Sequence, residues 1–186
     1  MLTRPESVAR VASGAIPVVG DALDASSFQH ELRAGDTLVH LVGTPHPSPV
    51  KTAEFRRVDL PSILASVTAA RHAGAAHVVY VSVAQPAPMM HAYISVRAQG
   101  EAALAASGLT TTVLRPWYVL GPGHWWPLAL VPLYTLARLI PATRAGAERL
   151  GLVRLDQMVS ALVRAVEQPP APGTIALVDV QGIRAA

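Results

Sequence analysis

The most informative stretch of this chain is His77-Val78-Val79-Tyr80-Val81-Ser82-Val83, a short run that is mostly apolar. It shows no clean alternation of apolar and polar residues, which is typical of a strand that is covered on both faces. Four further runs have the same character, namely Ala15–Val19, Thr37–Val42, Thr110–Leu114 and Thr174–Val180. We therefore expect a sheet of buried parallel strands.

Helical patterns separate these runs. The segment Pro61–Ala73 has Asp59 as a candidate N-cap and Gly74 as its stop. The other helical segments are His91–Ala106, Trp126–Ile140 and Leu155–Glu167. This alternation predicts the α/β class, a parallel sheet with flanking helices, in a single domain over residues 1–186. The tail Gln181–Ala186 is expected to be loose.

The composition excludes several classes of protein. The 186 residues include no cysteine, which rules out disulfides and cysteine-ligated metals. Hydrophobic residues make up 51% and charged residues 15%, so the chain is not disordered. The net charge is +3 and the arginines are scattered, so we expect no nucleic-acid partner. We also expect no metal site, because His40, His46 and His124 have no second ligand at a tight spacing.

The segment Pro116–Ala137 carries no formal charge and is long enough to span a bilayer. Four prolines and two glycines interrupt it, so a single membrane helix is excluded and a buried or interfacial helix is expected. Membrane-surface contact through Trp125 and Trp126 is the less favoured alternative. No apolar core follows the charged residues of Met1–Arg10, so we find no signal peptide and expect a cytoplasmic protein.

Four motifs lie in register with the strands. They are Val18–Asp24, His40–Gly43, Val79–Val83 with the following Tyr93–Arg97, and Leu114–Gly123. In this order they resemble the short-chain dehydrogenase/reductase superfamily, most closely its extended and atypical branches, the NmrA-like and sugar-epimerase-like proteins. The resemblance covers nearly the whole chain. It implies a Rossmann-like sheet and NADP or NAD as cofactor, with NADP favoured only through Arg4.

The resemblance also implies the residues of the site. Ser82, Tyr93 and Arg97 match the family's catalytic serine, tyrosine and lysine, as carbonyl orienter, proton donor and ribose anchor. Cofactor contacts fall on Tyr93 and Arg97 and on Arg4, Asp21, Ala22, Val42, Gly43, Pro116, Trp117 and Val119. Residues 117–170 are expected to form the substrate-side lid, with Trp117, Trp125, Trp126 and Tyr134 as its apolar part.

The spacing of Tyr93 and Arg97 supports these roles in part. Residues four apart share a helix face, and a nearby cation lowers the pKa of a phenol. Arginine cannot lose its proton, however, so Arg97 cannot relay protons as the family's lysine does. Two interpretations therefore stay open, an NADPH-dependent oxidoreductase acting on a small carbonyl, quinone-like or sugar-like substrate, and a non-catalytic dinucleotide sensor or assembly subunit. A tyrosine merely packed beside a solvated arginine, or a fragment without function of its own, are the remaining alternatives.

A glycine-rich turn that would seat a pyrophosphate is absent from the sequence. We therefore expect the fold to be N-terminally truncated, lacking its first strand, turn and helix. Ala15–Val19 then loses its hydrogen-bonding route to Thr37–Val42. An exposed sheet edge should follow, and with it self-association and weak dinucleotide binding.

Overall fold

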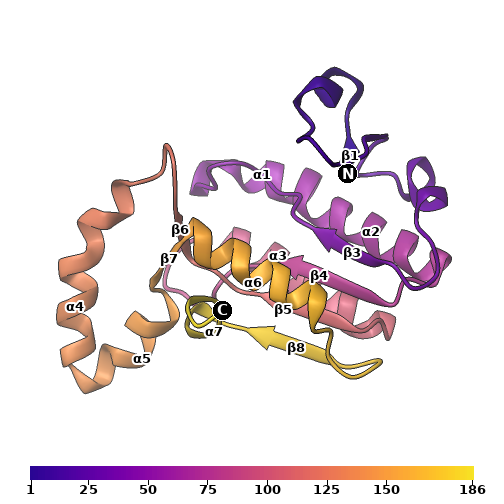
Figure 1. Cartoon of the computed structure of the whole chain (residues 1–186). Coiled ribbons are helices and arrows are strands. Elements are labelled where there is room, and N and C mark those ends of the chain that lie inside the picture. The colour runs from indigo at the N-terminus through magenta and orange to yellow at the C-terminus, as the bar shows by residue number, and fades with distance from the viewer.

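The computed structural model describes all residues from Met1 to Ala186. Its centre is a four-stranded parallel sheet, drawn in Figure 1. In spatial order the strands are β3 (Thr37–His40), β4 (His77–Val81), β5 (Thr111–Leu114) and β8 (Ile175–Val178). Each lies within one of the predicted runs, so the expected α/β class with a parallel sheet is confirmed.

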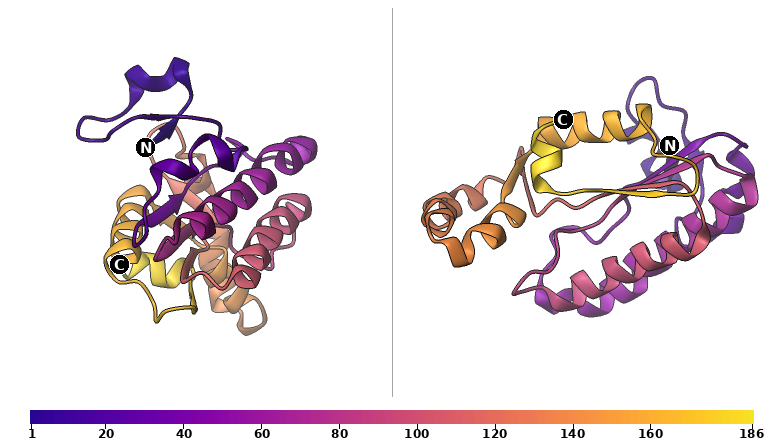
Figure 2. Two further views of the ribbon diagram at one scale, coloured as in Figure 1. Left: turned by 90° about the vertical axis from the view of Figure 1, so that its right-hand side faces the viewer. Right: turned by 90° about the horizontal axis from the view of Figure 1, so that it is seen from below.

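Helices cover both faces of this sheet (Figure 2). On β4, Tyr80 packs with Ile63 and Leu104 on one face, while Val79 packs with Met158 on the other. Each fully buried apolar side chain contributes about 1.5–3 kcal/mol, so both faces of the strand contribute to stability. Because both faces are covered, the strand shows no alternation of apolar and polar residues. The covering helices are α2 (Leu60–Ala73) and α3 (His91–Ser107) on the first face, and α6 (Leu155–Glu167) and α7 (Val180–Arg184) on the second.

The C-terminal segment corrects one expectation. The predicted loose tail is helix α7 over most of its length. Asp179 caps this helix, because its carboxylate accepts a hydrogen bond from the backbone N–H of Gly182. Val180 and Ile183 are completely buried beside α6. These two apolar side chains hold in place a C-terminal segment that was expected to be loose.

The helix before β4 contains an irregular turn. It runs from α1 (Thr52–Glu54) through a π-helical turn (Phe55–Asp59) into α2. The N–H of Leu60 bonds to the carbonyl of Phe55, five residues back, and the following Pro61 has no N–H to offer. The prediction that Asp59 caps the helix is therefore wrong, since Asp59 lies inside it and makes no cap bond. Gly74 ends the helix at φ +67°, as predicted.

A separate pair of strands lies at the N-terminus. The strands β1 (Leu2–Thr3) and β2 (Val18–Val19) are parallel and bond only to each other. They rest on α2 through an apolar cluster around Phe28. Ala15–Val19 thus lacks hydrogen bonds to the main sheet, as predicted, and the outer edge of β3 pairs with no strand (Figure 1). Short 3₁₀ helices occupy Pro5–Arg10, Ala25–Ser27, Gln29–Glu31 and Pro49–Lys51.

The region between β5 and α6 holds elements that the sequence did not predict. Two short parallel strands, β6 (Tyr118–Leu120) and β7 (Leu152–Arg154), form a third sheet. The predicted helix Trp126–Ile140 is divided into a 3₁₀ turn (Trp126–Leu130) and α4 (Val131–Leu139), and α5 (Pro141–Arg149) follows. Figure 1 shows α4 and α5 standing away from the sheet. No helix combines the length and the apolar character needed to cross a membrane.

The free edge of β3 predicts self-association through strand pairing. We expect sedimentation velocity to show oligomers that grow with protein concentration. Val39→Lys, which puts a charge on the exposed part of β3, should shift the distribution to monomer. Val163→Lys on α6, also a half-exposed valine, is the matched control and should leave it unchanged. A wild-type chain that stays monomeric over the whole range would contradict this prediction.

Candidate functional site

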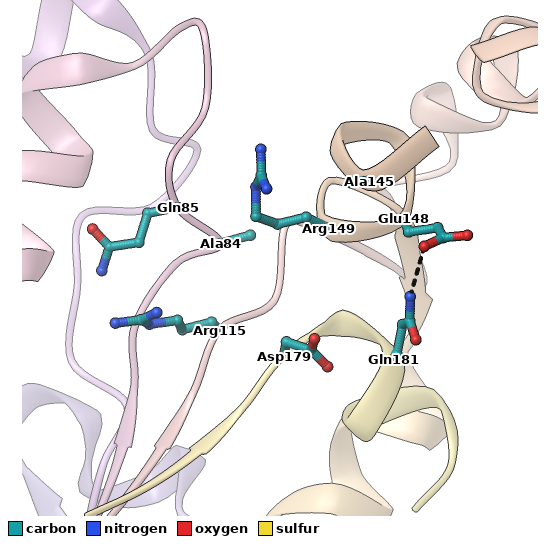
Figure 3. A pocket seen from close by; sticks show the side chains of 8 residues that line it. All are labelled: Ala84, Gln85, Arg115, Ala145, Glu148, Arg149, Asp179 and Gln181. Atoms are coloured by element: carbon teal, nitrogen blue, oxygen red, sulfur yellow. Dashed lines mark hydrogen bonds between the residues drawn. The ribbon is translucent and has the colours of Figure 1, made fainter. Parts of the chain in front are cut away.

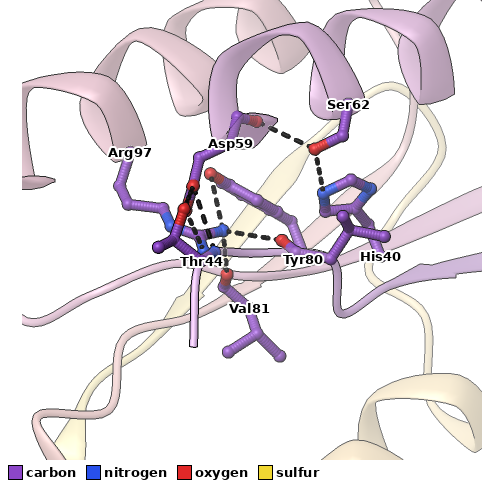
Figure 4. Close-up of polar contacts among 8 residues, drawn as sticks. His40, Thr44, Asp59, Ser62, Tyr80, Val81 and Arg97 are labelled. Carbon is purple, nitrogen blue, oxygen red and sulfur yellow. Dashed lines mark hydrogen bonds and ion pairs between the residues drawn. The ribbon is translucent and has the colours of Figure 1, made fainter. Parts of the chain in front are cut away.

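Arg97 on α3 forms the most buried ion pair of the structure. Its Nη2 lies 2.7 Å from Oδ1 of Asp59, and the two side chains are 6% and 1% exposed. The second oxygen of Asp59 accepts hydrogen bonds from the backbone N–H and the hydroxyl of Thr44, at 3.1 and 2.6 Å. The π-helical turn brings Asp59 to this place. Both oxygens of the carboxylate are therefore satisfied, which a buried charge requires (Figure 4).

The remaining hydrogen bonds of Arg97 reach the loop after β3 and strand β4. Its Nη1 donates to the carbonyl oxygens of Val42 and Val81, at 3.3 and 3.2 Å, and to the hydroxyl of Tyr80 at 3.5 Å. A Cβ on Gly43 would lie 2.1 Å from Nη2. Any side chain at position 43 would thus displace the guanidinium, so glycine is required there by this chain's own arginine.

Tyr93 lies one helical turn before Arg97. The centre of the guanidinium is 5.2 Å from the centroid of the Tyr93 ring. The ring of Phe55 also packs against Tyr93, with 5.0 Å between the two ring centroids. Burial raises the pKa of the Tyr93 hydroxyl above its ordinary value, and Arg97 lowers it only in part. The expectation of a depressed tyrosine pKa is therefore wrong in its net direction. Burial outweighs the cation, whose charge is already shared with Asp59.

A cavity of about 540 Å³ opens beside Tyr93. Its walls are mostly apolar and aromatic, and they come from the loop after β3, the loop after β4, and the segment around β6. This is the size and lining of a site for a small organic molecule. The lining residues are His46, Pro47, Ser48, Pro49, Val83, Met89, Met90, Tyr93, Trp117, Tyr118, Val119, Gly123, His124 and Trp126.

Three residues named from the sequence meet at this cavity, namely Tyr93, Trp117 and Val119. Of the expected aromatic lid, Trp126 also lines it, whereas Trp125 does not and is 54% exposed. Pro116 lies just before the cavity wall, and its carbonyl accepts a hydrogen bond from the N–H of Ala84. The loop after β5 therefore forms one wall, as a site at the carboxyl ends of parallel strands requires.

Ser82 faces a different set of groups. Its hydroxyl donates to Oε1 of Glu101 at 2.5 Å, and the residue is buried. The same carboxylate accepts from Gln85 at 3.0 Å and forms an ion pair with Arg115. Ser82 does not line the cavity beside Tyr93. The serine is thus held at the edge of a second network, with its one proton already donated.

That second network borders a smaller pocket of about 290 Å³, shown in Figure 3. Gln85 and Arg115 lie on the side of the sheet, and Glu148 and Gln181 lie on the opposite side. The N–H of the Gln181 amide donates to Glu148 at 3.2 Å. Most of these polar groups are paired within the protein, so the pocket has fewer free groups for a ligand than its lining suggests.

The remaining residues named from the sequence lie apart from both cavities. Arg4 forms an exposed ion pair with Glu6, and Asp21 accepts a hydrogen bond from the N–H of Leu23 within its own turn. Ala22 is half-buried in the same turn. All three residues follow a strand of the separate N-terminal pair, and none of them lines either pocket.

Asp59, Thr44 and Glu101 were missed by sequence reasoning. Glu101 follows Arg97 by four residues, and Asp59 is an isolated acid before an apolar helix. An acid four residues after an arginine and an isolated acid before a helix are both common on solvated helix faces. Neither pattern could therefore identify the partner of a buried charge. The partners of a buried charge depend on contacts between segments that are 38 residues apart in the case of Asp59 and Arg97.

The residues present fit one end of a dinucleotide. The aromatic cavity beside Tyr93 can take a flat ring. In the loop after β3, the guanidinium of Arg97 fills the space over Gly43. No glycine-rich turn opens a helix to supply free N–H groups.

Comparison with known proteins supports the fold. No family model matches the chain. A ceramide reductase from Caulobacter vibrioides is 26% identical over 165 residues, which cover 88% of this chain and 50% of that protein. The chain therefore spans half the length of this curated relative.

Solved structures show that the fold is Rossmann-like. The dTDP-glucose 4,6-dehydratase of Streptomyces venezuelae, solved with NAD bound, matches 94% of this chain and 62% of its own with TM-score 0.65 at 21% identity. A short-chain dehydrogenase/reductase superfamily protein from Agrobacterium tumefaciens, also with NAD, matches 93% of this chain and 70% of its own with TM-score 0.61 at 15% identity. At these identities the likeness concerns the fold alone.

Loss of the Asp59 carboxylate should destabilise the chain strongly. Asp59→Asn leaves the Arg97 charge buried without a counter-ion, which typically costs about 3–5 kcal/mol. Urea denaturation measures the loss. Asp156→Asn, which breaks the exposed pair with Arg154, is the matched control and should leave the stability close to that of the wild type. A loss below about 1 kcal/mol for Asp59→Asn would show that the buried pair is not needed.

Acid should destabilise the chain through His40. Burial, with the nearby charge of Arg97, lowers the pKa of His40 to about 3 in the folded state. The unfolded chain binds this proton near pH 6.5, so stability is present above pH 6.5 and is lost as the pH falls toward 3. The loss is about 1.4 kcal/mol per pH unit from this group. The buried His77, whose pKa is also lowered, adds to it with the same sign.

Urea unfolding at pH 7.5 and pH 4.5 tests this prediction. His40→Asn keeps a polar partner for the hydroxyl of Ser66, which lies 2.9 Å from Nδ1 of His40. The variant should lose less stability than the wild type between the two pH values. An equal loss in both proteins would exclude His40 as the cause.

Proposed function

We propose that this chain belongs to an NAD(P)-dependent oxidoreductase that acts on an apolar carbonyl compound. The observation that carries the proposal is the cavity beside Tyr93, whose aromatic walls and the phenol of Tyr93 suit a flat ring and a carbonyl group. The fold, and the NAD bound to two solved structures that share it, support a dinucleotide as the cofactor. The apolar lining favours a lipid-like or quinone-like substrate over a sugar, in keeping with the ceramide reductase relative.

Tyr93 is the proposed proton donor. Its raised pKa keeps the hydroxyl protonated at neutral pH, which suits an acid that gives its proton to a carbonyl oxygen. A nicotinamide ring, when bound, supplies or accepts the hydride. Tyr93, Trp117 and Val119 would hold this ring, and the lid formed by residues 117–170 would exclude water from it.

Arg97 contributes by position in this proposal. Its charge lies next to the Tyr93 ring and stabilises the phenolate that remains after proton transfer. The hydrogen bonds of Arg97 to Asp59, Val42 and Val81 fix this charge in place. The resemblance implies that Arg97 anchors the ribose of the cofactor. For that role the guanidinium would have to replace one of these bonds by a bond to the ribose. Ser82 can orient a carbonyl only if its bond to Glu101 is given up as well.

A non-catalytic dinucleotide sensor is the second candidate. The observation in its favour is that both assigned partners of Tyr93 are already bonded within the protein, Arg97 to Asp59 and Ser82 to Glu101. A protein that binds a dinucleotide without turnover needs neither group free. In this candidate, the adenosine end of the dinucleotide would contact Arg4, Asp21 and Ala22.

Replacing one hydroxyl in the cavity separates these candidates. We expect Tyr93→Phe to abolish oxidation of NADPH or NADH with a panel of apolar ketones and quinones, because the proton donor is lost. Tyr118→Phe, which removes a hydroxyl from the same cavity away from Arg97, should retain most of the wild-type rate. Absorbance at 340 nm measures turnover, and quenching of Trp117 and Trp126 fluorescence measures binding.

The outcomes are distinct. Turnover that survives in Tyr93→Phe excludes the tyrosine mechanism. Binding without turnover in the wild type favours the sensor. A wild-type chain that neither binds nor turns over the dinucleotide would refute both.

A further inference from the structure

Helix α4 exposes an apolar surface that nothing in the chain covers. Leu133, Leu136 and Leu139 are 63%, 58% and 71% exposed, and they are three residues apart, so they share one face of the helix. Ile140 extends this face at 47%. Of the nine residues of α4, only Tyr134 and Ala137 are partly buried. The sequence predicted a buried or interfacial helix here. The structure shows that the helix is not buried, because its leucines are exposed to solvent.

Two tryptophans continue the exposed surface toward the cavity. Trp125 and Trp126 are 54% and 56% exposed at the start of the 3₁₀ turn that leads into α4. Trp126 also lines the large cavity. Trp126 therefore links the cavity to the segment that leads into the apolar face of α4. Figure 1 shows this segment at one end of the molecule, with α5 on its inner side.

The segment around this surface carries charges of one sign. From Pro116 to Ala147 the only charged side chains are those of Arg138 and Arg144, and the first acid is Glu148. Arg138 follows Leu133 by five residues, so it lies on the polar side of α4, opposite the leucines. A basic polar side behind an apolar face is typical of a helix that lies on an anionic bilayer. Tryptophans beside an apolar face are typical of the headgroup level of a bilayer.

We propose that α4 and the preceding tryptophans dock on the surface of an anionic phospholipid bilayer. The leucine face enters the boundary between headgroups and acyl chains, and Arg138 and Arg144 contact lipid phosphates. With nine residues, α4 lies along the surface and does not cross the bilayer. This docking places the mouth of the cavity at the membrane surface, where an apolar molecule could pass into it directly from the lipid.

Vesicle flotation tests the proposal with the full chain and needs no enzymatic activity. We use vesicles of phosphatidylcholine alone and vesicles that also contain about 30% phosphatidylglycerol, whose negative surface potential attracts basic residues. The wild type should bind the anionic vesicles at least about tenfold more tightly, with the preference lost at high salt. Leu133→Gln with Leu136→Gln should lower binding by about tenfold or more.

Two further variants make the result specific. Arg138→Gln with Arg144→Gln should abolish the preference for anionic vesicles while the leucines remain. Val159→Gln with Val163→Gln on α6 is the matched control, since it removes two valines of similar exposure elsewhere, and it should bind as the wild type does. Repeating the assay in a Val39→Lys background separates vesicle binding from association through β3.

Three results would overturn the proposal. The first is a wild type that floats with neither kind of vesicle. The second is a leucine double variant that binds as well as the wild type. The third is a leucine double variant that only dissociates oligomers in sedimentation, without any change in flotation, which would assign the surface to a second copy of the chain.

Discussion

The buried guanidinium of Arg97 is the constraint around which the central part of the chain is arranged. A charge that is 6% exposed is tolerable only where oxygen atoms surround it. Here those oxygens come from the helix before β4, from the loop after β3 and from β4 itself. One side chain on α3 thus ties together two helices, a loop and a strand. The π-helical turn and Gly43 follow from the same need, since the first aims Asp59 at the cation and the second leaves room for it.

The same bonds limit what the site can do. A cation that is shared among a carboxylate and three other oxygens acts less on its neighbour, so burial decides the pKa of Tyr93 and keeps its hydroxyl protonated. A lysine at this position would offer three rotatable donors and could give up a proton, whereas the fixed fork of arginine favours a rigid network. An arginine at this position therefore exchanges the mobile proton of a lysine for structural rigidity. Both proposed functions have to operate within that exchange.

The sequence predicted the frame of the fold because its signals are local. The apolar runs of β4 and β5, the stop at Gly74 and the stripe of α6 each depend on residues within a few positions. The buried partners Asp59 and Glu101 and the helical tail around Ile183 could not be predicted in this way. Whether an acid faces water or an arginine depends on packing between distant segments, and a short polar tail becomes a helix only because a hollow beside α6 accepts two apolar side chains. Motif order located Tyr93 and Trp117 at one cavity, but it could not show that Ser82 turns toward Glu101.

The edge of β3 and the apolar face of α4 are both uncovered, and they require different partners. The edge of β3 presents backbone N–H and C=O groups, which only another extended chain can pair in register. Helix α4 satisfies its own backbone and presents leucine side chains, for which any apolar medium serves. A strand partner would complete the sheet without covering α4, and a lipid surface would cover α4 without completing the sheet. The two surfaces are therefore independent, and burial of one leaves the requirement of the other unchanged.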